Sequence, residues 1–161
     1  MELLKNTVIH PDFQILPFRE RHLENVNIAQ YESRYIESLA KGYHKTNFNH
    51  DGLSYTYISD GEILCCFGVQ LLWQGVGELW MMPSDNDDMF LISHMSKISE
   101  LIDIIIKDFS LNRLQIQVTV PNERTLCFVK SIGFEIEGTL KNYGPEGNDY
   151  FMLARTVDRK S

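Results

Sequence analysis

The sequence has few of the features that mark disulfide-bonded, metal-binding, membrane-spanning or nucleic-acid-binding proteins. It has only 3 cysteines, without a CxxC pair or a cysteine–histidine cluster at the spacing of metal ligands. No apolar run approaches the ~18 residues of a membrane span. Lysine and arginine (15) are outnumbered by aspartate and glutamate (22), and the net charge of -7 disfavours binding to nucleic acid or anionic lipid over a broad surface. We therefore expect a reduced cytoplasmic protein with no metal, no nucleic-acid partner and no membrane partner.

What the sequence does contain is enough apolar residues for one globular domain. Of its 161 residues, 43% are hydrophobic and 23% are charged. A chain of this length buries roughly 70% of its unfolded surface, so its core needs no disulfide or metal. We expect a single domain over residues 1–161, with an N-terminal leader at 1–12 and a C-terminal tail at 156–161.

Hydrophobic periodicity and turn residues predict the order of helices and strands. An Asp60-Gly61 turn predicts a hairpin, because this pair supplies the backbone twist that such turns need. The longest apolar stripe at helical spacing ends at Phe109, and Asn122 and Gly133 are positioned to begin and end a shorter helix. The order implies an α/β (α+β) fold with a mixed sheet and helices on both faces. The expected strands are 13–18, 53–58, 63–71, 78–82, 114–120, 134–136 and 149–155, and the expected helices are 20–41, 86–109 and 122–133.

The stretch from Pro121 to Gly138 resembles the C-terminal half of a GNAT-superfamily N-acetyltransferase. In that family a strand leads into Asn-x-x-Ala, and a short helix then ends in Gly-Phe before a further strand that often carries Glu-Gly. The matching residues here are Asn122, Gly133-Phe134 and Glu137-Gly138, with Thr125 in place of the alanine. The resemblance covers about residues 13–155. It implies a mostly antiparallel GNAT-like sheet of about seven strands, and transfer of an acetyl group from acetyl-CoA to an amine: a small molecule, a protein N-terminus or a lysine.

The loop that holds the cofactor pyrophosphate in this family departs from the usual pattern. Aligning the family's Val-x-Pro with Met81-Met82-Pro83 places the loop at 86–91, where Met89 and Leu91 replace two glycines. Glycine lets the backbone approach a phosphate closely, so its loss weakens this kind of site. Three acids, at positions 85, 87 and 88, also fall where the phosphate charges would lie, although they equally suit a helix N-terminus. The resemblance implies cofactor contacts at Met81, Met82, Asn122 and Phe128.

Candidate catalytic residues follow from the same resemblance. Many relatives carry a tyrosine on the short helix that protonates the leaving thiolate, and Val129 stands at that position here. Glu78 is the candidate general base, because it lies on the strand where several relatives carry a carboxylate. Tyr143 is the candidate acid or substrate contact. Each has a plainer alternative: Glu78 as a charge at a strand start, Tyr143 as a packing anchor and Asn122 as a helix cap.

A narrower likeness fits these departures. Gly68, the Gly75–Trp80 segment, the glycine-free loop and the short helix without tyrosine are similar to the acetyltransferase-like internal virion proteins of short-tailed phages. Two functions therefore stay open. The first is an acyl-CoA-dependent N-acetyltransferase. The second is a catalytically impaired GNAT-fold structural or interaction protein, for example virion-associated, that binds a protein partner or a second copy of itself.

Overall fold

The computed structural model describes residues 8–10, 13–25, 53–84 and 88–158. The chain divides into two compact units. The first unit comprises residues 1–70 and 79–86, and the second comprises 71–78 and 87–161. Two long strands, β4 (Glu62–Trp73) and β5 (Val76–Pro83), contribute residues to both units.

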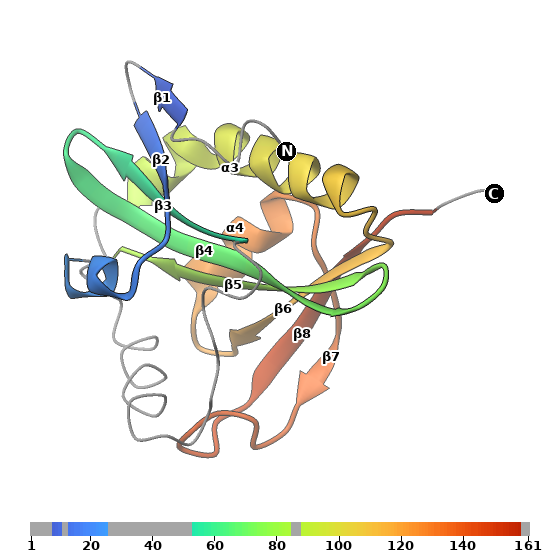
Figure 1. Ribbon diagram of the computed structural model, residues 1–161. Helices are drawn as coiled ribbons and strands as arrows, with labels where there is room; N and C mark the ends of the chain where they lie inside the picture. Colours follow the sequence, from blue (N-terminus) through green and yellow to red (C-terminus); the bar gives the residue numbers. More distant parts are fainter. Residues whose placement is uncertain (1–7, 11–12, 26–52, 85–87, 159–161) are drawn as a thin grey trace. The chain divides into compact units, whose positions relative to one another are not determined.

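The first unit is an antiparallel meander that begins at the N-terminus (Figure 1). Asp60 (φ 50°) and Gly61 (φ 76°) form the turn between β3 and β4, and both adopt the left-handed conformation that a tight hairpin needs. The predicted hairpin is therefore confirmed. Besides β4 and β5, its elements are β1 (Val8–His10), β2 (Phe13–Pro17), the 3-10 helix η1 (Glu20–Asn25) and β3 (Ser54–Ser59).

The core of the first unit is built on β3 and β4, whose central residues are buried. A cluster of Phe18, Cys66 and Met82 is completed by partly buried neighbours, among them Trp80, whose ring packs edge-on against Phe18 at a centroid distance of 5.2 Å. Gly68 of β4 faces this region closely: a Cβ there would lie 2.6 Å from Trp80 Nε1. A side chain at position 68 therefore has no room.

His22 ties η1 to β3. Its Nδ1 accepts a hydrogen bond from the backbone N–H of Arg19 at 3.2 Å and lies 2.7 Å from Thr56 Oγ1. Because the Arg19 N–H can only donate, Nδ1 is unprotonated and Thr56 is the donor to it. Partial burial, followed by the nearby charges of Arg21 and Arg19, lowers the pKa of His22 and so favours this neutral form.

The second unit contains the tip of the β4–β5 hairpin, two helices and three further strands (Figure 1). β5 pairs with β6 in parallel over Val76–Glu78 and Arg113–Gln115. β8 then pairs antiparallel with both β6 and β7, which gives the strand order β1-β2-β3-β4-β5-β6-β8-β7. The elements introduced here are α3 (Asp88–Asp108), β6 (Arg113–Thr119), α4 (Glu123–Ser131), β7 (Glu135–Leu140) and β8 (Tyr150–Thr156).

Strand β6 separates an apolar face from a polar one. Its alternate residues Leu114, Ile116 and Val118 are buried. So are the inner residues of α4 and, on α3, Ile98, Leu101, Ile102, Ile105 and Ile106. The intervening residues Arg113, Gln115 and Gln117 are only partly buried and lie on the opposite face, which we call the polar face. One face of β6 therefore belongs to the core of the second unit, and the other face carries polar side chains.

The expected α/β class, with a mixed and mostly antiparallel sheet, is confirmed. One strand was not predicted: β1 lies within the expected leader, because three residues are too few to show an alternating pattern. Of the helix expected at 20–41, the described part is the 3-10 helix η1, and the remainder lies outside the described residues. No helix in the described part of the chain is long and apolar enough to cross a membrane.

Candidate active site

Glu78 lies on β5 where this strand pairs with β6. The preceding turn contains Gly75 (φ 83°), which lets the chain reverse into β5, and the Gly75 carbonyl accepts hydrogen bonds from Asn112 and Arg113. Glu78 and Gln115 are partners in the parallel register, so their side chains project from the same face of the sheet. Glu78 is therefore a partly buried carboxylate on the polar face.

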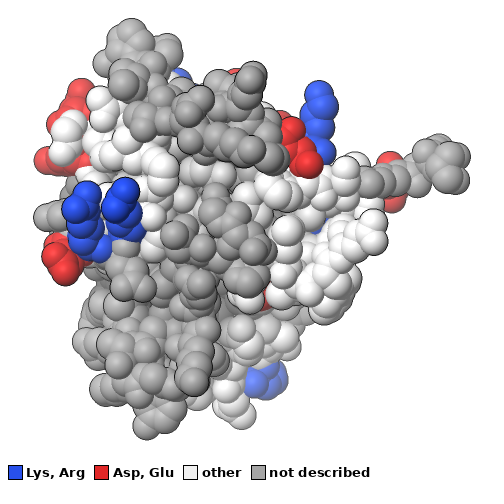
Figure 2. Space-filling model, viewed as in Figure 1, with Lys and Arg blue, Asp and Glu red and all other residues white. Residues whose placement is uncertain are grey.

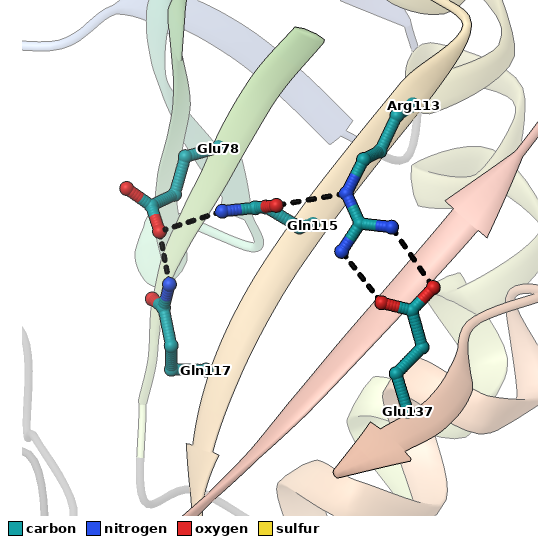
Figure 3. A network of polar contacts seen from close by, with 5 residues as sticks. All are labelled: Glu78, Arg113, Gln115, Gln117 and Glu137. Carbon is teal, nitrogen blue, oxygen red and sulfur yellow. Dashed lines mark hydrogen bonds and ion pairs between the residues drawn. The ribbon is translucent and has the colours of Figure 1, made fainter. Parts of the chain in front are cut away.

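One oxygen of this carboxylate is held by two amides (Figure 3). Gln117 Nε2 donates a short hydrogen bond to Glu78 Oε1, and Gln115 Nε2 approaches the same oxygen at 3.5 Å. The second oxygen, Oε2, has no recorded polar partner among the residues that the structure describes. The carboxylate is thus fixed on one side and available on the other.

The polar network continues from Gln115 to an ion pair. Arg113 Nε donates to Gln115 Oε1 at 2.8 Å, and the two terminal nitrogens of Arg113 bind the two oxygens of Glu137 at 2.8 and 2.6 Å. The hydrogen bonds to Arg113 lower the pKa of Glu137, and those same bonds raise the pKa of Arg113. The register of β7 shifts between Ile136 and Gly138, so Glu137 is the additional residue of a β-bulge.

Sequence reasoning named Glu78 as a candidate base but did not name the residues that hydrogen-bond to it. The alternation in β6 placed Gln115 and Gln117 on a polar side, and it gave no reason to expect them beside Glu78. The parallel pairing of β5 with β6 brings them there, although they lie 37 and 39 positions from Glu78 in the sequence. A carboxylate in one strand together with a run of alternating glutamines in another was the available signal.

Tyr143 lies in the loop between β7 and β8, and its side chain is 51% exposed. Its ring packs edge-on against Tyr150, with centroids 5.1 Å apart. Tyr150 pairs with Thr119, two residues beyond the pair of Met152 with Gln117, so Tyr150 lies on the polar face as well. The packing role that we considered for Tyr143 is therefore present in the structure.

The same loop has a defined conformation. Asn148 Nδ2 donates to Thr119 Oγ1 at 2.8 Å and anchors the loop to β6. Asp149 accepts hydrogen bonds from the backbone of Asn142 and from Lys141, and these bonds lower the pKa of Asp149. The loop is thus held at both of its ends.

The four residues expected to contact a cofactor have different environments. Met82 is 2% exposed in the core of the first unit, whereas its neighbour Met81 is partly buried. In the second unit, Asn122 Oδ1 accepts from the backbone N–H of Thr125 at 3.1 Å and so caps α4. Phe128 is 7% exposed on the same helix. The structure therefore gives Met82, Asn122 and Phe128 structural roles.

Most of the expected pyrophosphate loop lies outside the described residues. Asp85, Asn86 and Asp87 belong to this part, and Asp88 is the first residue of α3. Val129, at the position of the family's tyrosine, is completely buried in the second unit. The helix face at that position is thus a packing surface.

Charged side chains on the visible face are dispersed. In Figure 2 the described basic and acidic residues form small separate groups, and no continuous basic stripe crosses the described part of that face.

Comparison with known proteins places this geometry in a family. A search of curated proteins finds no significant match. Solved structures with the same fold include Ard1 from Thermoplasma volcanium, with 18% identity, a TM-score of 0.70, and coverage of 92% of this chain and 99% of that chain. A ribosomal-protein-S5-alanine acetyltransferase from Vibrio fischeri has 15% identity, a TM-score of 0.64, and coverage of 97% and 99%. RimL, a ribosomal L7/L12 α-N-protein acetyltransferase solved with coenzyme A, has 14% identity, a TM-score of 0.68, and coverage of 95% and 99%.

The family profile described as an acetyltransferase (GNAT) domain matches residues 24–152, which is most of the chain. This range includes Glu78, its two glutamines and the capped helix α4. The expected family resemblance is thereby confirmed, and the chain belongs to the GNAT acetyltransferase family.

Proposed function

We propose that this protein transfers an acetyl group from acetyl-CoA to an amine, and that Glu78 accepts the proton of that amine. The observation that carries this proposal is the asymmetry of the Glu78 carboxylate. Two glutamine amides hold Oε1, and Oε2 has no polar partner among the described residues. A general base needs such an oxygen within hydrogen-bond reach of the proton that it removes.

The reaction needs one new bond, one broken bond and one proton acceptor. Acetyl-CoA supplies a thioester carbonyl to which the amine nitrogen adds. As the carbon–nitrogen bond forms and the carbon–sulfur bond breaks, Glu78 Oε2 takes the proton that the nitrogen loses. The electron pair of the broken bond leaves with the sulfur, which is protonated from solvent, since Val129 supplies no acid. Holding the nitrogen in line with the carbonyl supplies much of the rate.

The residues fit the cofactor in part. The pairing of β5 with β6 runs over Val76–Glu78 and Arg113–Gln115, and the part of β5 after Glu78 is where we propose that the amides of the pantetheine arm bind. Met82 would act through its backbone, because its side chain is in the core. Met81 of the first unit remains a proposed cofactor contact, as do Asn122 and Phe128 of the second unit, where Asn122 also caps α4.

The acceptor is an amine that is cationic in solution. It gives one proton to solvent before its neutral nitrogen adds to the thioester, and Glu78 takes the second proton as the amide forms. The net charge of -7 attracts such molecules, and the exposed ring of Tyr143, which packs against Tyr150, offers a contact for them. Among the structural neighbours are a ribosomal-protein-S5-alanine acetyltransferase and a spermidine N-acetyltransferase chimera. A peptide with an N-terminal alanine and spermidine are therefore the first two acceptors to test.

A second candidate function is favoured by specific departures. The expected phosphate loop has no glycine and three aspartates, and the buried Val129 replaces an acid. A GNAT fold that has lost its chemistry would serve as an interaction protein, and the virion-associated case is one such role. Calorimetric titration with acetyl-CoA separates the two candidates. We expect a dissociation constant of about 1–100 μM, and absence of binding at ~1 mM would favour the interaction protein.

The base assignment is tested by Glu78→Gln. This change keeps the shape of the side chain and removes the proton acceptor, so kcat should fall about 100-fold or more while the dissociation constant for acetyl-CoA changes less than about twofold. Glu135→Gln is the matched control, because Glu135 is an exposed glutamate of the same unit outside the network. Wild-type turnover in Glu78→Gln would show that another group takes the proton.

A further inference from the structure

We infer that Gln115 is a positioning residue, which together with Arg113 and Glu137 fixes the direction in which Glu78 presents its free oxygen. This inference rests on the proposed function, since it concerns how the proposed base is aimed. It adds three residues to the site, and none of them takes part in the bond changes.

The orientation of the Gln115 amide follows from its neighbour. Arg113 Nε carries a hydrogen and can only donate, so the Gln115 atom 2.8 Å away must be the oxygen. The Gln115 NH2 group consequently points the other way, towards Glu78 Oε1. A free glutamine would be able to turn its oxygen towards the carboxylate, which would repel it.

Arg113 is itself held in place. Its bidentate pair with Glu137 uses both terminal nitrogens and leaves Nε directed at Gln115. The chain from Glu137 through Arg113 to Gln115 therefore fixes a donor against one oxygen of Glu78. Gln117 donates to that same oxygen, which leaves Oε2 as the atom that meets the substrate.

Gln115→Met tests the inference, because it keeps the length of the side chain and removes both its donor and its acceptor. With the amine that the wild type acetylates fastest, kcat should fall about 10- to 100-fold. The KM for the amine and the dissociation constant for acetyl-CoA should each change less than about twofold. A wild-type kcat in this variant would overturn the inference.

A matched pair tests the remote end of the chain. Glu137→Ala breaks the pair with Arg113, and Asp103→Ala breaks a second arginine–carboxylate pair of the same unit, with Arg155. Both carboxylates are on the surface, so each loss should cost little stability. Only Glu137→Ala should lower kcat, by several-fold. Equal effects of the two changes would contradict positioning through Arg113.

A spectroscopic readout separates failure of this inference from failure of the proposed function. In NMR spectra of the 15N-labelled wild type and of Glu78→Gln, the side-chain amide resonances of Gln115 and Gln117 should shift between the two proteins, and those of Gln14 on β2 should not. This measurement needs no turnover. If the wild type acetylates no amine and the Gln115 resonances still shift, the proposed function fails and the positioning stands. Unshifted Gln115 resonances would overturn the positioning whatever the activity.

Discussion

A single residue can have a structural role in addition to the chemical role proposed for it. Asn122 is an example. The family resemblance implies that it contacts the cofactor, and in the structure its side chain caps α4 by accepting a hydrogen bond from the Thr125 backbone N–H. Because Asn122 is 6% exposed, its side chain has little freedom to do both at once. The two roles are separable by substitution, since aspartate retains the cap and alanine does not.

We expect Asn122→Ala to lower the free energy of unfolding by about 1 kcal/mol, measured by urea denaturation, because one N–H of the first helical turn loses its acceptor. Asn122→Asp should retain most of the stability. Calorimetry on both variants then reports the cofactor role. An Asn122→Ala variant as stable as the wild type would mean that the cap contributes nothing.

The space around a strand differs from one strand to another, and two strand glycines, Gly68 and Gly138, show this difference. At Gly68 of β4 an added Cβ would lie 2.7 Å from Ser54 Oγ and 2.8 Å from the Leu53 carbonyl oxygen. At Gly138 of β7 it would meet no described atom within 4 Å. Neither glycine has a positive φ, so the effect of replacing it with alanine depends on the space around the new Cβ and not on backbone strain.

Gly68→Ala should therefore destabilise the protein by about 1–3 kcal/mol, since a backbone carbonyl cannot move aside without disturbing β3. Gly138→Ala is the matched control and should stay within ~0.5 kcal/mol of the wild type. Urea denaturation of the two variants measures both values. Similar losses of unfolding free energy in the two variants would show that the close contacts at Gly68 do not determine the cost of the substitution.

Elements with a long local pattern were predictable, and pairings between distant segments were not. Helix α3, the Asp60-Gly61 turn and the cap of α4 each depend on residues close together in the sequence, and all three are present in the structure. Glu78 was proposed from the family resemblance and stays a prediction. Its partner Gln117 was missed, because the register between β5 and β6 depends on tertiary packing that no local window contains.

Over the whole molecule, the three thiols have unequal environments. Cys65 and Cys66 are buried in the first unit, whereas Cys127 is exposed on α4. Burial raises the pKa of Cys66 to about 11, although a hydrogen bond with Thr56 acts in the opposite direction. Burial, with a further contribution from Cys66, also raises the pKa of Cys65 well above its usual range. Both thiols stay protonated near neutral pH.

Titration with Ellman's reagent at pH 8 should accordingly show one fast thiol in the native protein and three after unfolding in urea. At this pH a thiol with a pKa of about 11 is only ~0.1% thiolate, and burial slows its reaction further. Cys127→Ser should remove the fast phase and leave the slow ones. Two or more fast thiols in the native wild type would show that the first unit opens readily.

The β-bulge at Glu137 also bears on solubility. β7 is the last strand in the sheet order, so its outer backbone groups would be a template for a strand of another molecule. The bulge interrupts the regular spacing of those groups, and the exposed Glu135 adds repulsion between copies. We therefore expect the bulge at Glu137, besides placing the partner of Arg113, to hinder edge-to-edge pairing of β7 between molecules.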